Sequence, residues 1–196
     1  MRSSFSTRAL LMTALLATSM ASTTHAAPIA VTSVIGTGTY SNDVSLLTDG
    51  NIPPESTGWT ENTNVYWNGT DPTFTFQFDS VYRLDGVLIQ VDNNDDYRID
   101  YSVNGSTWSS LYTISQGDGT VGYGMDTFTQ SDISFAPVDA RYIRVSATGG
   151  DNMYAISEVQ AFGTGPVPEP ATLTLLGSGL LISGVFRKRK ESALSN

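Results

Sequence analysis

The chain has 196 residues, no cysteine and one histidine, His25, and these absences limit its chemistry. Without cysteine there is no disulfide to stabilise the fold and no thiolate for catalysis. If His25 is removed by processing, as argued below, neither a Ser-His-Asp centre nor a usual zinc or iron site can form. Lysine is absent from residues 27–165, which excludes Schiff-base chemistry there. A glycosidase-type carboxylate pair is the remaining catalytic option, and acidic residues scattered over loops do not make one, so we expect no enzyme.

Positive charge is also scarce in the middle of the chain. Seventeen of the nineteen acidic residues but only four of the ten basic residues fall within residues 27–165, which gives this segment a net charge of −13. Such a surface repels nucleic acid and anionic lipid, so no nucleic-acid partner is expected. An acidic surface of this kind is compatible with binding of calcium or of neutral glycans, and it also favours solubility.

Residues 1–26 have the pattern of a secretory signal peptide. Arg2 and Arg8 supply the positive region, residues 9–20 the apolar run, and Thr24-His25-Ala26 the small-residue cleavage site. We expect cleavage after Ala26, with cleavage after Ala27 as the alternative. An uncleaved N-terminal anchor is the other interpretation, and the apolar run is short for a membrane span.

Residues 166–190 combine a short motif, Pro168-Glu169-Pro170, with the apolar run 171–186 and the basic cluster 187–190, and the polar tail 191–196 follows. This order resembles the PEP-CTERM sorting signal of Gram-negative bacteria that make exopolysaccharide. The resemblance implies transient insertion into the inner membrane, processing by an exosortase-type enzyme, and localisation at the cell surface or in the extracellular matrix.

The apolar run of this tail is short for a permanent anchor. Its sixteen residues would form a helix of roughly 24 Å, against a hydrocarbon core of roughly 30 Å. A permanent C-terminal membrane helix is the alternative to a sorting signal. In both cases the basic cluster stays cytoplasmic and the preceding domain lies across the membrane.

The remaining segment, residues 27–165, has the size of one domain and the patterns of β-strands. Phe74, Phe76 and Phe78 alternate with polar residues, which places them on one face of a strand. Asn104-Gly105 is a strong hairpin turn signal, and the loop 46–59 is rich in proline and glycine. The expected strands are 29–34, 73–78, 84–91, 97–103, 107–114, 128–135, 141–145 and 156–162. Because no helical periodicity appears between the terminal segments, we predict an all-β fold, an antiparallel β-sandwich of jelly-roll type.

Four sequence landmarks occur in order along this segment: Asp49-Gly50-Asn51 with Thr57 and Trp59, then 103–108, 140–145 and 156–163. Together they resemble the discoidin domain, of the coagulation factor 5/8 C-terminal type. That resemblance implies the galactose-binding-like fold that many carbohydrate-binding modules share. It also implies ligand binding by loops at one end of the sandwich, and a structural calcium ion where the first long loop meets the last strand.

The resemblance places this calcium ion at four residues. Asp49 and Glu158 would supply carboxylate oxygens, while Asn51 and Thr57 would supply side-chain or backbone oxygens, with neighbouring carbonyls completing the shell. Hard oxygen ligands in a flexible loop are what calcium requires. In the alternative interpretation Asp49 only caps a turn and Glu158 lies on a solvent-facing surface.

The loops 40–43, 66–68, 92–96 and 149–154 are the candidates for ligand binding. Sugar recognition needs a flat apolar face for the ring and planar amide or carboxylate groups for the hydroxyls. Both kinds occur in the predicted ligand-binding residues, which are Trp67, Asn93, Asn94, Asp95, Tyr40, Asn42, Asn152 and Tyr154. Trp59 and Trp108 are expected in the core. These loops contain no basic residue, which argues against a membrane ligand.

Two functions fit these features. The first is an exported, non-catalytic module that binds extracellular carbohydrate or exopolysaccharide. The alternative is a structural protein of the extracellular matrix or biofilm, without a specific glycan ligand. A convergent groove holding Trp67 with residues 93–95 would favour the first, and scattered polar loops would favour the second.

Overall fold

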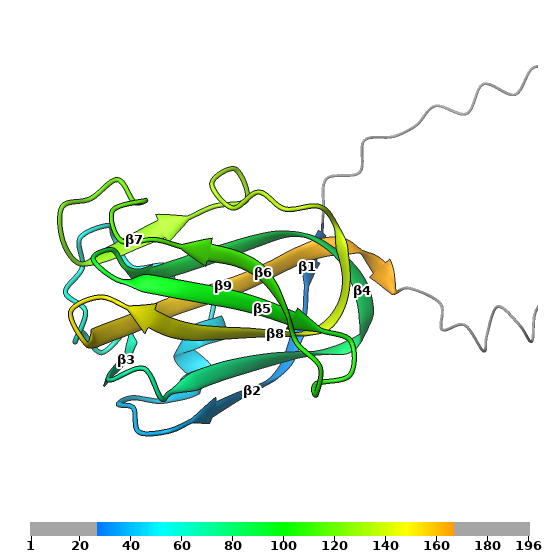
Figure 1. The fold of residues 1–196 in the computed structure, drawn as a ribbon, viewed down its shortest axis with the longest axis horizontal. Helices are drawn as coiled ribbons and strands as arrows, with labels where there is room; N and C mark the ends of the chain where they lie inside the picture. Colours follow the sequence, from blue (N-terminus) through cyan, green and yellow to red (C-terminus); the bar gives the residue numbers. More distant parts are fainter. Residues whose placement is uncertain (1–26, 167–196) are drawn as a thin grey trace, which may run out of the picture.

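The computed structural model of the protein describes residues 27–166, which form an antiparallel β-sandwich (Figure 1). The strands are β1 (Ala27–Ile29), β2 (Val31–Thr37), β3 (Val65–Asn68), β4 (Thr73–Asp92), β5 (Asp96–Ser102), β6 (Ser109–Ile114), β7 (Met125–Phe128), β8 (Val138–Gly149) and β9 (Met153–Pro166), and a 3-10 helix η1 (Val44–Thr48) follows β2. The strand pairs between these elements are antiparallel, which confirms the predicted all-β class.

The predicted signal peptide, the sorting motif Pro168-Glu169-Pro170 and the apolar and basic segments after it lie outside the described residues. Within residues 27–166, no helix has the length and apolar character needed to cross a membrane.

The long strand β4 belongs to both layers of the sandwich. Its residues 73–77 lie between β2 and β8, and β8 continues the first layer to β5 and β6. Its residues 89–91 lie between β9 and β7, and β9 also pairs with β1 and β3. The register with β8 shifts between Gln77 and Tyr82, and residues 82–84 pair with both β8 and β9. The predicted strands 73–78 and 84–91 are therefore two parts of one bent strand.

The core lies between these layers. Phe74, Phe76 and Phe78 are fully buried, as their alternation predicted, and the aliphatic residues Val145 and Ile143 on β8 are fully buried as well. A large buried side chain contributes roughly 1.5 to 3 kcal/mol relative to an exposed one, so this row of rings is a main source of stability.

The expected strand 128–135 is wrong, because β7 ends at Phe128 and a turn follows. The Asp132 carboxylate accepts hydrogen bonds from the Thr129 backbone N–H (2.8 Å) and hydroxyl (2.7 Å), which closes this turn. The hairpin at Asn104-Gly105 is confirmed but is wider than expected, since the Asn104 side chain accepts from the N–H groups of Ser106 and Thr107. A side chain that bonds neighbouring backbone competes with strand pairing.

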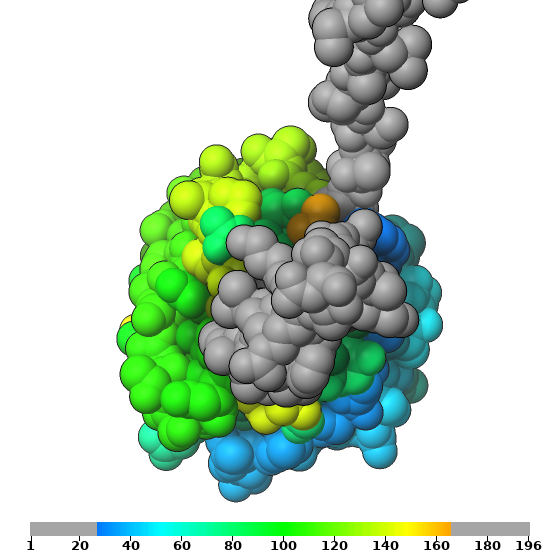
Figure 2. All heavy atoms as spheres, turned by 90° about the vertical axis from the view of Figure 1, so that its right-hand side faces the viewer, coloured from blue at the N-terminus to red at the C-terminus, as the bar shows by residue number. Residues whose placement is uncertain are grey.

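The two ends of the described chain lie together. Ala27 of β1 is paired with Gly163 of β9, and Figure 2 views this end of the molecule, where the blue first strand lies close to the orange last strand. The turn between β4 and β5 and the loop between β8 and β9 lie at the opposite end, on the left in Figure 1. That end holds the predicted ligand-binding loops.

Candidate functional site

Three of the predicted ligand-binding loops meet at this far end. The Asn94 amide donates to the Asp151 carboxylate at 2.9 Å, which joins the β4–β5 turn to the β8–β9 loop. Trp67 is paired with Tyr154, and the Gly69 N–H donates to the Asn152 carbonyl at 3.2 Å. Loops far apart in the sequence therefore form one surface, as expected.

Trp67 and Tyr154 are not on that surface, so the prediction that they bind the ligand is wrong. Each side chain is only 2% exposed. The Trp67 ring packs against Phe74, Tyr97 and Tyr154, with ring centroids 5.0, 6.5 and 5.8 Å away. Trp67 lies two residues after the buried Val65 on β3, so both point into the core.

Asn93 and Asp95 are also buried, and their hydrogen bonds hold loops in place. The Asn93 side chain donates to the Val121 carbonyl, and its backbone N–H donates to the Gly124 carbonyl at 3.1 Å. The Asp95 carboxylate accepts from the Asp151 N–H at 3.0 Å and is 0% exposed. The expectation that these two side chains meet a ligand directly is corrected to a supporting role.

Tyr40 and Asn42 likewise serve the fold. Tyr40 packs edge-on against Phe74, with ring centroids 5.2 Å apart. Asn42 has a positive φ of 69°, and its side chain donates to the Asn64 carbonyl at 2.8 Å. Asn152, another of the eight predicted residues, is exposed and has a positive φ of 76°.

A pocket of about 260 Å³ opens between these loops, and we call it the Trp59 pocket. It is lined by Gly58, Trp59, Asp92, Asn94, Gly122, Tyr123, Gly124 and Asp151. Tyr123 is 70% exposed and Trp59 is partly exposed, while Asp92 is 3% exposed. Aromatic side chains and oxygen acceptors therefore meet in one concave site, with Asn94 as the predicted residue that lines it.

Trp59 was predicted to be a core residue, and the structure places it at the pocket instead. Its ring packs edge-on against Tyr66, with centroids 5.6 Å apart. The buried Asn64 side chain donates to the carbonyls of Gly58 (2.9 Å) and Trp59 (3.1 Å), which fixes the loop. Trp108, also expected in the core, is partly exposed, and the Arg144 guanidinium lies 4.3 Å from its ring centroid.

Tyr123 is presented by a loop that a buried carboxylate holds. Asp126, 2% exposed, accepts from the Val121 N–H at 3.2 Å and from the Thr120 N–H. The two glycines that flank Tyr123 in the sequence are a loop signature that could have directed attention to it. The sequence analysis did not select this residue.

Gly124 joins this loop to the one that carries Trp59. Its φ is +72°, and a Cβ atom there would come within 2.5 Å of the Thr57 carbonyl oxygen. We expect G124A to lower the free energy of unfolding by about 1 to 3 kcal/mol, because the backbone is strained and the two loops must separate. Urea unfolding of G124A beside G122A tests this, since a Cβ at Gly122 meets nothing within 4 Å. Equal effects of the two substitutions would contradict the prediction.

Carboxylates dominate the electrostatics of the Trp59 pocket. Burial, and then the charge of Asp151, raise the pKa of Asp92 to about 6. Burial is also the main cause that raises the pKa of Asp95, which is hydrogen-bonded to the lining residue Asp151, to about 7, with further increases from the charges of Asp92 and Asp151. No arginine lines the pocket, so these carboxylates lack a positive partner there.

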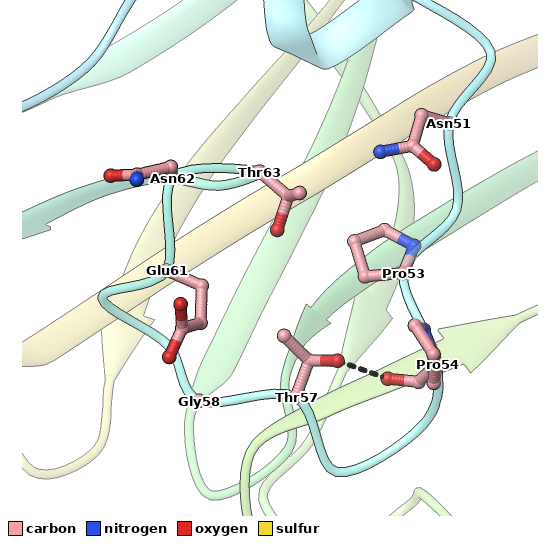
Figure 3. A pocket seen from close by; sticks show the side chains of 8 residues that line it. All are labelled: Asn51, Pro53, Pro54, Thr57, Gly58, Glu61, Asn62 and Thr63. Carbon is pink, nitrogen blue, oxygen red and sulfur yellow. Dashed lines mark hydrogen bonds between the residues drawn. The ribbon is translucent and has the colours of Figure 1, made fainter.

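A second pocket, of about 480 Å³, lies next to the first and shares Gly58 with it. We call it the Asn51 pocket, and Figure 3 shows its lining residues, which are Asn51, Pro53, Pro54, Thr57, Gly58, Glu61, Asn62 and Thr63. The Thr57 hydroxyl donates to the Pro54 carbonyl at 2.6 Å, the dashed line in Figure 3. Two of the predicted calcium ligands, Asn51 and Thr57, therefore border one cavity.

The other two predicted calcium ligands lie where the first long loop meets β9. Glu158 is 1% exposed and accepts from the Gly50 N–H at 3.3 Å and from the Gln160 amide at 3.0 Å. The interpretation that Glu158 faces solvent is therefore wrong, whereas Asp49 does cap a turn by accepting from the Asn51 N–H at 2.8 Å. Burial raises the pKa of Glu158, and the charge of Asp49 raises it further.

A calcium ion at these residues stays a prediction, and the charge of Glu158 is the feature that a cation would balance. Glu158 forms no ion pair with an arginine of the described segment, so a buried carboxylate beside Asp49 has no positive partner there. Within residues 27–166 no three acidic, histidine or cysteine side chains gather at metal-binding spacing, so backbone carbonyls would have to complete the shell. Calcium accepts such a mixture of carboxylate and carbonyl oxygens.

The described residues form a two-layered antiparallel β-sandwich with a loop-lined pocket at the end opposite its paired chain ends. Residues 28–159 match the profile of the F5/8 type C domain, and the chain belongs to that family. Residues 166–190 match the PEP-CTERM protein-sorting motif, which indicates export to the cell surface through a sorting system. No curated protein sequence matches the chain.

Solved structures that are similar to this chain have low sequence identity to it. "CBM32 of AlyQ in complex with 4,5-unsaturated mannuronic acid" has 17% identity and a TM-score of 0.50, covering 70% of this chain and 99% of its own. A pectin-binding carbohydrate-binding module has 19% identity and a TM-score of 0.47, covering 71% and 96%. CBM32-1 from a family 31 glycoside hydrolase of Clostridium perfringens has 14% identity and a TM-score of 0.45, covering 67% and 94%.

Proposed function

We propose that this protein is a non-catalytic carbohydrate-binding module that its sorting tail delivers to the bacterial surface. The observation that carries the proposal is the Trp59 pocket, where a partly exposed tryptophan lies beside the buried Asp92, the half-buried Asn94 and the exposed Asp151. Trp59 would stack on the C–H face of a sugar ring, and Asp92, Asn94 and Asp151 would accept or donate hydrogen bonds to its hydroxyls. The similar CBM32 of AlyQ, whose structure was solved in complex with 4,5-unsaturated mannuronic acid, supports a sugar-binding use of this fold.

The partner is then an extracellular polysaccharide of the producing cell, and an exosortase-type enzyme processes the tail after transient insertion in the inner membrane. We place the mature protein at the surface or in the matrix of a Gram-negative bacterium. A calcium ion at Asp49, Asn51, Thr57 and Glu158 would stiffen the loop that carries Trp59, because Thr57 lies two residues before that ring.

Substitution of Trp59 by alanine tests the proposal. We expect W59A to weaken binding of the best glycan on a printed array by at least about 30-fold, because stacking on an aromatic ring is lost. The control is W108A, which removes a tryptophan that is not among the lining residues of either pocket. Binding of no glycan by the full chain, with or without calcium, would instead favour a structural matrix or biofilm protein.

A further inference from the structure

The Trp59 pocket contains a buried acceptor that lacks a donor. The Oδ1 atom of Asp92 is buried and forms no hydrogen bond within the described part of the chain. Asp92 is 3% exposed and lines the pocket. An unpaired buried acceptor, above all a charged one, costs free energy that a ligand donor would recover. A ligand that donates a hydrogen bond at this atom would satisfy it.

The neighbouring carboxylate is already held in place. Asp151 Oδ1 accepts from the Met153 N–H at 2.9 Å, and its Oδ2 accepts from the Asn94 amide at 2.9 Å. Asp151 is thus fixed with its charge close to Asp92, and after burial this charge is the second cause that raises the pKa of Asp92. Two carboxylates at one opening, one of them with a free oxygen, favour a positively charged donor.

No basic side chain of the described residues competes for this place. The arginines of residues 27–166 are engaged elsewhere: Arg83 with Asp139 at 3.0 Å, Arg98 and Arg144 with Asp100 at 3.2 and 2.7 Å, and Arg141 over the Tyr142 ring at 5.9 Å. None of the four is among the residues that line either pocket. An anionic sugar would therefore meet only like charge at this site.

A bare metal ion fits this opening less well than an organic cation. Within the described residues the acidic side chains do not gather in groups of three at metal-binding spacing. An ammonium group has three N–H donors, of which one can bond to a carboxylate while the others bond to water, and a ring attached to it can lie on Trp59.

We propose that the Trp59 pocket selects a carbohydrate with a free, protonated amino group, a hexosamine without its acetyl group. The ammonium donates to Asp92 Oδ1 and faces Asp151, and the sugar ring stacks on Trp59. This inference rests on the proposed function, since it names the class of sugar that the same pocket takes. It also predicts that uronic acid polymers are excluded.

Titration calorimetry of the full chain, purified in mild detergent, tests the inference with three oligosaccharides of equal length. These are oligomers of glucosamine, the same oligomers fully N-acetylated, and oligogalacturonate. We expect the glucosamine oligomer to bind about tenfold or more tightly than its acetylated counterpart, as a hydrogen bond to a charged group implies. The oligogalacturonate is expected not to bind.

Two variants separate a specific contact from general attraction to an acidic protein. D92N is expected to bring the ratio of the two affinities close to one. D71N removes the same charge from an exposed residue outside both pockets and is expected to keep the ratio. If D92N and D71N lost the preference for the glucosamine oligomer to the same extent, the inference would be overturned.

The failure of this inference differs from the failure of the proposed function. Equal binding of the free and acetylated oligomers, or tighter binding of oligogalacturonate, overturns the amino-sugar inference but leaves a carbohydrate-binding module. Tighter binding of a lysine-rich peptide than of any sugar, with the same dependence on Asp92, overturns it in favour of a protein partner. Binding of none of the sugars overturns both.

Discussion

Replacement of Asp95 by asparagine is expected to stabilise the protein by on the order of 3 kcal/mol at pH 8 and to change its stability little at pH 4. Burial is the main cause that raises the pKa of this carboxyl from 3.8 to about 7, and the charges of Asp92 and Asp151 raise it further. Hydrogen bonds from the Asp151 N–H and the Tyr97 hydroxyl offset part of this increase. Asparagine keeps an acceptor for the Asp151 N–H and removes the charge.

The pH window follows from the direction of the shift. Below about pH 4 the carboxyl is protonated in both the folded and the unfolded chain, so its ionisation adds no cost. Between about pH 4 and pH 7 the unfolded chain loses this proton while the folded protein keeps it, so stability falls as pH rises. Above about pH 7 the loss of stability caused by ionisation of Asp95 no longer changes with pH. Asp92, with a pKa of about 6, adds a similar loss between about pH 4 and pH 6.

Urea unfolding from pH 4 to pH 8, followed by tryptophan fluorescence, measures this effect. The difference between D95N and the parent protein should grow across the window and then level off. D71N serves as the control, because it removes one acidic charge at an exposed position. A difference that is the same at pH 4 and pH 8 would contradict the assignment of the cost to ionisation of Asp95.

Periodicity predicted most of the fold because the strands obey a local rule. The alternation of Phe74, Phe76 and Phe78 requires one buried face, and the structure confirms it. What failed were places where side chains bond nearby backbone, such as Asp132 after β7. Alternation alone does not reveal such a turn, and it does not show that β4 passes through both layers.

The sequence predicted which loops form the candidate site, but not which of their residues line it. The loops 66–68, 92–96 and 149–154 do meet, as the family resemblance implied, yet the roles of two tryptophans were exchanged. Trp67 follows Val65 by two residues, and this spacing marks a strand with one inward face, whereas Trp59 ends a loop rich in proline and glycine. A check of period two around each tryptophan would have separated them. That Tyr123 and Asp151 come to the same pocket follows only from the three-dimensional arrangement.

If calcium binds where the first long loop meets β9, its addition is expected to raise the melting temperature of the chelator-treated protein by about 10 to 15 °C. An ion at about a thousand times its dissociation constant stabilises the folded state by about 4 kcal/mol, and a domain of this size gains a few degrees per kcal/mol. The gain is large here because the ion would neutralise Glu158, a buried carboxylate whose pKa is raised by burial and by the charge of Asp49. Magnesium should give a smaller rise, because it requires a more rigid octahedral shell.

Thermal unfolding of two matched variants locates the ion. E158Q keeps the shape of the side chain and an acceptor for the Gly50 N–H but loses the charge, so calcium should no longer raise its melting temperature. Without calcium, E158Q should be at least as stable as the parent protein, since no uncompensated charge is buried. E61Q changes an exposed carboxylate that lines the Asn51 pocket and should keep the full rise. If E61Q abolished the rise and E158Q kept it, the ion would lie in the Asn51 pocket, away from Glu158, and the neutralisation argument would fail.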